Sequence, residues 1–138
     1  MEKQCRKCPA GCCRYFSFPI DRPETYEDFE QIRWYLLHRG ISVYIDADGQ
    51  WNIIIRNLCR MLRKTAGGWR CKEYASRPPI CRGFSPRTCD FTHGGIACEE
   101  FFGTGRQLES YAGRMLGEAA FDKARSKMTA KMKKKKRR

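Results

Sequence analysis

The stretch ISVYIDADGQWNIII, residues 41–55, has the composition of a β-hairpin. Its two halves, ISVYI and WNIII, are rich in the β-branched and aromatic residues that favour strands. The segment between them, Asp46-Ala47-Asp48-Gly49, is rich in turn-forming residues. This segment also resembles the start of a calcium-binding loop, but the later ligands of an EF-hand are missing, which favours a plain turn.

A helix is predicted on each side of this hairpin. Within residues 21–39, Phe29, Ile32 and Leu36 recur at helical spacing. Residues 104 to about 130 carry a second apolar stripe at the same spacing. The stripe consists of Leu108, Tyr111, Ala112, Met115, Leu116, Ala119 and Ala120. Between the hairpin and the second helix, glycine and proline divide the chain into turns and short pieces with little periodic hydrophobicity.

The net charge of +13 comes mainly from the end of the chain. Residues 123–138 hold ten Lys and Arg and no Asp or Glu, whereas residues 1–122 hold 18 basic and 15 acidic residues. Like charges repel at that density, so the last residues are predicted to be disordered. We therefore expect a cysteine-cluster domain, residues 1–122, followed by a basic tail, residues 123–138. Such a tail can bind nucleic acid or an anionic surface, but a solubilising or non-specific role is favoured.

The length and the cysteine content indicate which chemistry to expect. A chain of 138 residues can fold as one domain without covalent cross-links. Its opening, MEKQCRKC, lacks the apolar region of a signal peptide, and its longest apolar run, residues 34–37, is too short to span a bilayer. A cytoplasmic location without a transmembrane segment is therefore expected. Thiols stay reduced there, so nine cysteines favour metal binding over disulfides.

Four of the nine cysteines, Cys5, Cys8, Cys12 and Cys13, lie within nine residues. The others are Cys59, Cys71, Cys81, Cys89 and Cys98. Cys5 and Cys8 have the C-x2-C spacing that is common to zinc knuckles and iron–sulfur loops. The side chains of the adjacent pair diverge, so these two thiols seldom bind the same metal, and the spacing leaves open which of them is a ligand. Histidine adds little. His38 lies near a helix end, where a cationic or capping role is favoured, and His93, between Cys89 and Cys98, is a possible but less favoured ligand.

Two segments carry a more specific pattern. One is CRKCPAGCC, residues 5–13, and the other is CKEYASRPPICRGF, residues 71–84, which is close to C-x-x-Y-x-x-R-P-x-x-C-R-x-F. They resemble the CxxCxxCC (YkgJ/YcgN-type) cysteine-cluster family, whose members are described as zinc- or iron-chelating and often as iron–sulfur cluster proteins. The first segment departs from the family name, because three residues rather than two separate Cys8 from Cys12.

The resemblance implies eight metal-ligating cysteines and leaves Cys98 as the extra one. The implied ligands are Cys5, Cys8, Cys12, Cys13, Cys59, Cys71, Cys81 and Cys89. In the second segment, the residue before Pro78 is restricted to an extended backbone, which turns Cys81 back toward Cys71. Arginines 77 and 82 lie beside these cysteines in sequence and are expected to stabilise thiolates, while Tyr74 either packs or donates to a sulfur.

These features predict a small, irregular α+β domain organised around thiolate-bound metal, with a β-hairpin, two main helices and a disordered basic tail. The favoured function is that of an iron–sulfur protein in redox or electron-transfer chemistry, acting with a redox or protein partner. The first alternative is a zinc-binding structural or interaction protein with four-cysteine sites. The second is a protein-modifying component, because the resemblance extends to a flagellin lysine N-methylase with a similar cysteine domain. The sequence shows no G-x-G-x-x-G segment or P-loop after a strand, and it names no catalytic residue.

Overall fold

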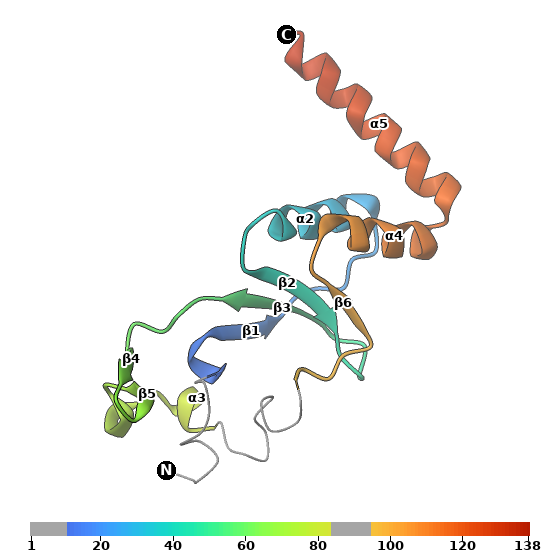
Figure 1. The fold of residues 1–138 in the computed structure, drawn as a ribbon. Helices are drawn as coiled ribbons and strands as arrows, with labels where there is room; N and C mark the ends of the chain where they lie inside the picture. The colour runs from blue at the N-terminus through green and yellow to red at the C-terminus, as the bar shows by residue number, and fades with distance from the viewer. Residues whose placement is uncertain (1–10, 84–94) are drawn as a thin grey trace.

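The protein is an α+β structure, as the sequence predicts, built from a four-stranded antiparallel sheet, a separate two-stranded hairpin and helices (Figure 1). A computed structural model describes residues 11–83 and 95–138. The strands are β1 (Tyr15–Pro19), β2 (Ile41–Ile45), β3 (Trp51–Arg56), β4 (Leu62–Thr65), β5 (Gly68–Cys71) and β6 (Glu100–Phe102). The helices are α2 (Tyr26–Leu36), α3 (Pro79–Arg82), α4 (Gly105–Leu116) and α5 (Glu118–Lys136).

The predicted hairpin forms the centre of the large sheet, whose strand order is β1-β3-β2-β6. The carboxylate of Asp46 closes its turn by accepting hydrogen bonds from the backbone N–H groups of Asp48 (2.9 Å) and Gln50 (3.0 Å). Gly49 takes a φ of 80°, a left-handed conformation that glycine adopts without steric cost. The turn predicted between the two strands is therefore present, with its first carboxylate hydrogen-bonded to the backbone.

Both edge strands of this sheet were absent from the sequence-based prediction. Strand β1 pairs antiparallel with β3, in a register that places Tyr15 opposite Arg56. Strand β6 pairs antiparallel with β2 and places Phe102 opposite Val43. Residues 15 and 16, which closely follow the first cysteine segment, are the first two residues of β1 and pair with Arg56 and Ile55 of β3.

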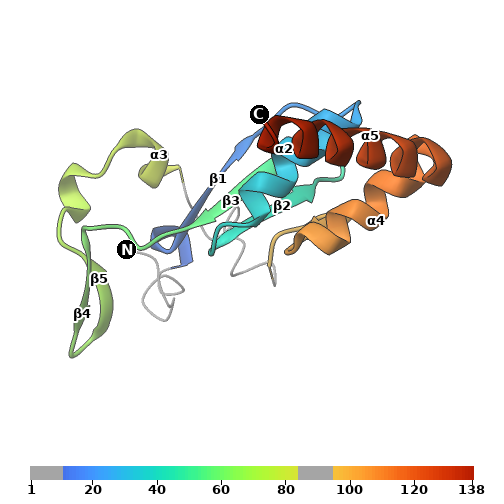
Figure 2. The ribbon, with the colours of Figure 1, turned by 90° about the horizontal axis from the view of Figure 1, so that it is seen from above.

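The hydrophobic core lies between one face of the sheet and helices α2 and α4, which run side by side above it (Figure 2). Alternate residues of the central strands, such as Val43 and Trp51, point into this layer, as the two-residue period of a strand requires. The ring of Phe102 stacks on that of Trp51 with 5.5 Å between centroids, and Tyr111 meets Phe102 edge-on at 5.2 Å. Helix α2 contributes Phe29, whose ring lies 6.2 Å from that of Trp51.

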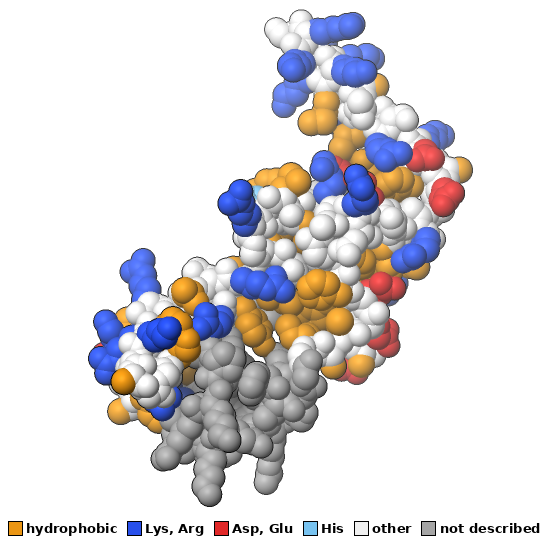
Figure 3. Space-filling view, in the orientation of Figure 1, with side chains coloured by type: hydrophobic (Ala, Val, Ile, Leu, Met, Phe, Trp, Pro, Cys, Tyr) orange, Lys and Arg blue, Asp and Glu red, His pale blue; other side chains and the backbone are white. Residues whose placement is uncertain are grey.

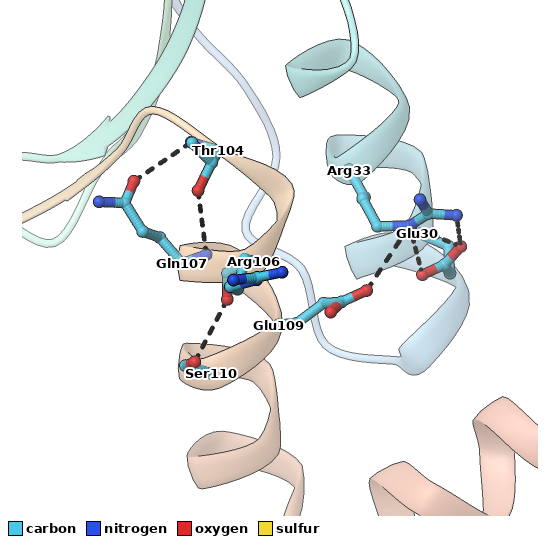
Figure 4. A network of polar contacts seen from close by, with 7 residues as sticks. All are labelled: Glu30, Arg33, Thr104, Arg106, Gln107, Glu109 and Ser110. Carbon is cyan, nitrogen blue, oxygen red and sulfur yellow. Dashed lines mark hydrogen bonds and ion pairs between the residues drawn. The ribbon is translucent and has the colours of Figure 1, made fainter.

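Polar side chains define the starts of α2 and α4 and join the two helices. A capping box forms at each start, between Thr25 and Asp28 in α2 and between Thr104 and Gln107 in α4, and Figure 4 shows the second of these. Within α2, the guanidinium of Arg33 pairs with the carboxylate of Glu30 at 2.8 Å. The same guanidinium lies 4.0 Å from the carboxylate of Glu109 in α4 and so joins the two helices. The Thr25 cap explains why α2 starts at Tyr26, later than the predicted start at residue 21.

The C-terminal part of the chain differs from its prediction in two ways. The single helix expected from residue 104 to about 130 is interrupted at Gly117, whose φ of 85° lies outside the helical region. The expectation of a disordered end is also wrong, because α5 continues to Lys136. Lysine is a good helix former, and cations in the last turn interact favourably with the helix dipole, which offsets their mutual repulsion.

In the described ranges, no helix combines the length and the apolar character needed to cross a membrane.

Residues 57–83 form a second region, here called the cysteine lobe, which holds the β4–β5 hairpin, a 3₁₀ turn at Tyr74–Ser76 and helix α3 (Figure 1). The short pieces expected here are present, but the hairpin is an addition to the prediction. No residue of the lobe is buried. Its order within the described structure therefore comes from backbone hydrogen bonds and local side-chain contacts, and not from an apolar core.

Candidate metal site

The structure places five of the eight predicted ligands in described positions. Cys12 and Cys13 end a 3₁₀ turn (Gly11–Cys13) just before β1, Cys59 follows β3, Cys71 ends β5, and Cys81 lies in α3. The predicted ligands Cys5, Cys8 and Cys89, together with His93, lie outside the described residues.

The pairing of β1 with β3 brings the adjacent cysteines Cys12 and Cys13 to Cys59. Antiparallel pairing continues past the strand ends, where the N–H of Asn57 donates to the carbonyl of Arg14 at 2.9 Å. The N–H of Cys59 then donates to the carbonyl of Cys13 at 2.8 Å. Two cysteines that are far apart in sequence are thus linked by the backbone of one sheet edge.

The β4–β5 hairpin returns Cys71 toward the same end of the molecule. Directly after Cys59, the chain turns, and the N–H of Leu62 donates to the carbonyl of Cys59 at 3.1 Å. Leu62 then pairs with Cys71 across the hairpin, and Lys72 donates to the carbonyl of Met61 at 2.8 Å. The turn after Cys59 and the register of the hairpin therefore fix where Cys71 lies.

The segment between Cys71 and Cys81 is braced by its own arginines. The guanidinium of Arg77 lies over the ring of Tyr74 at 3.8 Å, and its Nε donates to the Tyr74 carbonyl at 2.9 Å. Arg82 donates to the carbonyls of Arg77 (3.1 Å) and Ala75 (2.8 Å). Tyrosine and arginine of the Y-x-x-R-P-x-x-C-R pattern thus hold the loop that carries Cys81.

The backbone around the proline follows the sequence-based expectation. Arg77 has φ −54° and ψ 141°, the extended conformation required before Pro78. Pro79 then occupies the first turn of α3, where its missing N–H costs no hydrogen bond. These contacts of Arg77 and Arg82 go to carbonyl groups and to the Tyr74 ring, so both arginines act on the shape of the loop.

Cys13 is the thiol on which the others converge. Burial raises the pKa of the Cys13 thiol above its ordinary value, while a hydrogen bond with Cys12 lowers it. The negative charges of Cys59, Cys71 and Cys81, when these are ionised, add smaller increases to the same pKa. Cys13 is therefore close enough to thiols from three other segments of the chain to be affected by their charge.

The donor set is chemically suited to a soft metal, although its geometry is incomplete within the described residues. All the side chains that shift the Cys13 pKa are thiols, which bind zinc and iron as thiolates. Across residues 11–83 and 95–138, no three Cys, His, Asp or Glu side chains are close enough together to hold a metal ion. The cysteines thus share one end of the molecule without forming a coordination sphere there.

Cys98 lies apart from this group. The residue after it, Glu99, donates its N–H to the carbonyl of Ile45, which pairs with Trp51 at the start of β3. Cys59 follows the other end of β3. The length of the central strands therefore separates Cys98 from Cys13 and Cys59.

A contact between Arg14 and Trp69 is one feature that sequence reasoning missed. The guanidinium of Arg14 lies 4.6 Å from the centroid of the Trp69 ring and links the start of β1 to β5. Arg14 also lines a shallow open pocket of about 570 Å³, together with Tyr15, Arg56, Asn57 and Leu58. The sequence offered one indication of this contact, because each residue lies next to a predicted ligand. Arg14 follows Cys13 directly, and Trp69 precedes Cys71 by two residues.

The cysteine lobe is strongly basic. It holds seven Lys and Arg and one acidic residue, Glu73. The basic residues are Arg60, Arg63, Lys64, Arg70, Lys72, Arg77 and Arg82. Lys and Arg side chains gather over the β4–β5 end of the molecule in Figure 3. Positive charge in this region can offset the negative charge that several metal-bound thiolates would bring together.

Comparisons with known proteins agree with the donor chemistry. No curated protein and no solved structure matches the chain. A family model described as "CxxCxxCC: Putative zinc- or iron-chelating domain" matches residues 4–104, which span both cysteine segments and the sheet and end directly before α4. Because this match covers more than half of the chain, the protein belongs to the CxxCxxCC family.

Proposed function

We propose that this protein holds an iron–sulfur cluster through cysteine thiolates and acts in redox or electron-transfer chemistry. The observation that carries the proposal is the placement of thiols from separate segments at one end of the molecule, where the edge of the sheet joins Cys13 to Cys59 and the β4–β5 hairpin returns Cys71. The proposed ligands are Cys5, Cys8, Cys12, Cys13, Cys59, Cys71, Cys81 and Cys89. Thiolate ligation on irregular loops, with basic side chains nearby, is typical of iron–sulfur sites.

Each part of the chain has a distinct role in this proposal. The β1–β3 pairing holds Cys13 beside Cys59, and the arginine-braced loop carries Cys81. Burial raises the pKa of the Cys13 thiol, so metal binding there must displace its proton. The basic residues of the lobe offset the negative charge that several thiolates bring together. A bound cluster would supply one-electron chemistry, which the side chains alone cannot perform.

Metal and sulfide analysis of protein purified without oxygen tests the proposal. We expect a brown solution that absorbs broadly near ~400 nm and contains both iron and acid-labile sulfide. A colourless protein with stoichiometric zinc and no sulfide would contradict the cluster. That result would instead support the alternative of a zinc-binding structural or interaction protein.

Single substitutions test which cysteines belong to the site. We expect Cys71→Ser to lower the metal content of the folded protein sharply, because serine replaces a thiolate ligand with a poorer one. Cys98→Ser is the matched control and should leave the metal content unchanged. Equal metal loss in both variants would contradict the assignment of Cys98 as the extra cysteine. Separate Cys12→Ser and Cys13→Ser variants show which of the adjacent pair is a ligand.

A further inference from the structure

The end of α5 is a second functional candidate, and it lies outside the region matched by the family model. Residues 129–138, here called the basic tip, hold seven Lys and Arg and no acidic residue. Every residue of the tip is exposed. Figures 1 and 3 show that the helix extends away from the sheet and from the other helices, with Lys and Arg side chains along its outer part.

The base of α5 is anchored, whereas the basic tip is not. Phe121 is buried, and its ring meets that of Tyr26 at 5.3 Å between centroids. Ala124 and Met128 lie on the same helical face and pack against the core. After Met128 the helix continues through residues 129–136, which at 1.5 Å per residue is about 12 Å of helix. The tip is therefore presented to solvent by a fixed base.

The charges of the tip have no acidic partners in the described part of the chain. The ion pairs there join Arg33 to Glu30 and Glu109, and Arg125 to Asp122. The basic residues of the cysteine lobe lie among the thiols whose charge they can offset, but the tip has no such counterpart. Its positive charge is therefore available to a polyanion.

The distribution of these charges favours a groove over a flat surface. Lys133, Lys134, Lys135 and Lys136 are consecutive, so their side chains leave the helix at intervals of about 100° and surround it. A flat anionic membrane would meet only some of them, and Met132 is the one large apolar side chain available to insert. The major groove of B-DNA, about 12 Å wide, admits a helix and presents phosphates on both sides.

The composition of the tip also separates duplex from single-stranded partners. It contains no aromatic residue on which an unpaired base could stack. The deep major groove of duplex RNA is too narrow for side chains to read. We propose that the basic tip of α5 binds double-stranded DNA through the phosphates that line the major groove, without sequence preference.

Fluorescence anisotropy with the full chain and a labelled random-sequence DNA duplex tests this proposal over a series of salt concentrations. The tip variant carries K133Q, K134Q, K135Q and K136Q. The control carries R60Q, R63Q, K64Q and K72Q, which remove the same charge from the cysteine lobe. A third protein ends at residue 130 and lacks only exposed residues. Circular dichroism establishes that each variant keeps the fold.

We expect the tip variant and the shortened protein to bind the duplex at least ~10-fold more weakly than the full chain. The slope of log K against log salt should fall by about 3 to 4 in the tip variant, because each phosphate contact contributes about 0.9. The lobe control should keep most of the original slope. An unchanged slope in the tip variant, or an equal loss in the control, would overturn the proposal. Tighter binding to duplex RNA, to single-stranded DNA or to phosphatidylserine vesicles would also overturn it.

Discussion

The sheet with its helices and the cysteine lobe differ in what holds them together. The sheet region buries a continuous cluster in which Val43, Phe102 and Leu108 are almost fully removed from solvent. The lobe, residues 57–83, has no buried residue, and large apolar side chains such as Leu58 and Ile80 are exposed. One part of the molecule has an apolar core of its own, and the other has none.

This difference indicates that the two regions depend on different sources of stability. Apolar burial provides the main favourable contribution to folding, and it is concentrated in the sheet region. The lobe relies on the β4–β5 pairing and on contacts such as Arg77 with Tyr74, which are individually weak and open to solvent. A bound metal would therefore matter most to the lobe and least to the sheet.

Removing the metal should have the largest effect on stability, and it should destabilise the cysteine lobe without destabilising the sheet region. Under reducing conditions with a chelator, we expect the Lys72 amide of the lobe to lose its protection from hydrogen exchange. Amides of β2 and β3 should keep theirs, because the apolar core is unchanged. Structural metal sites contribute on the order of 10 kcal/mol, which exceeds what the lobe gains from its local contacts. Simultaneous loss of protection in both regions would show that the sheet also depends on the metal.

A core substitution tests the opposite side of the comparison. Phe102 is 2% exposed and packs between Trp51 and Tyr111. We expect Phe102→Ala to lower the free energy of unfolding by about 3–5 kcal/mol, because it removes buried contacts and leaves a cavity. Urea denaturation followed by tryptophan fluorescence measures this change.

Its neighbour in β6 provides the matched control. Phe101 is 43% exposed on the other face of the sheet, so Phe101→Ala should cost about 1 kcal/mol or less. The metal content per folded molecule should stay the same in both variants. A comparable loss of stability in the two variants would contradict the assignment of the core to the helix-covered face.

Loss of a helix cap should have a smaller effect, confined to the sheet region. The side chain of Thr104 accepts a hydrogen bond from the backbone N–H of Gln107 at 3.3 Å. We expect Thr104→Ala to cost about 1 kcal/mol in thermal or urea unfolding, because an N–H at the start of α4 loses its partner. Thr129→Ala in exposed α5 removes a hydroxyl without removing a cap, so it should be close to neutral.

Acid should weaken the cap of α2, and this is the smallest effect expected. Hydrogen bonds from the backbone N–H groups of Glu24 and Thr25 hold the pKa of Asp28 below its ordinary value of 3.8. The stabilisation from this carboxylate is therefore complete above that ordinary value and is lost as the pH falls through the lower, folded-state pKa. Unfolding measured between neutral and strongly acidic pH should show this loss, and Asp28→Asn should reduce it. An acid transition that is identical in the variant would contradict the assignment to Asp28.

Some elements could be predicted well because the residue types and spacing within the element are enough to indicate a strand or a helix. The β-branched runs on either side of Asp46 and Gly49 predicted the central hairpin, and the spacing of Phe29, Ile32 and Leu36 predicted α2. The glycines between the hairpin and the second helix indicated only breaks in the chain, although Gly67 and Gly68 lie where two paired strands of four residues each are joined. Such short strands contain too few residues to establish a two-residue period.

Other features depend on pairing partners and could not be predicted from local sequence. Phe16 and Phe18 are spaced as in a strand, yet both are exposed in β1. Their spacing therefore does not mark a buried face, and β1 is defined by its pairing with β3. The proximity of Cys13 to Cys59 follows from the register of β1 against β3, which spacing along the chain does not reveal. The cysteine pattern indicated thiolate chemistry, whereas the positions of the thiols relative to one another could be learned only from the folded structure.

The hydrogen bond from Cys59 to Cys13 has a consequence for how easily a metal ion could be captured. In an unfolded chain, the entropy cost of bringing two such distant ligands together rises with the length of the loop between them. Here the sheet has already closed that loop, so the effective concentration of the second thiol near the first is set by β-sheet geometry. Insertions or deletions in the connection between β1 and β2 should therefore change the stability of the sheet without changing the distance between these two donors.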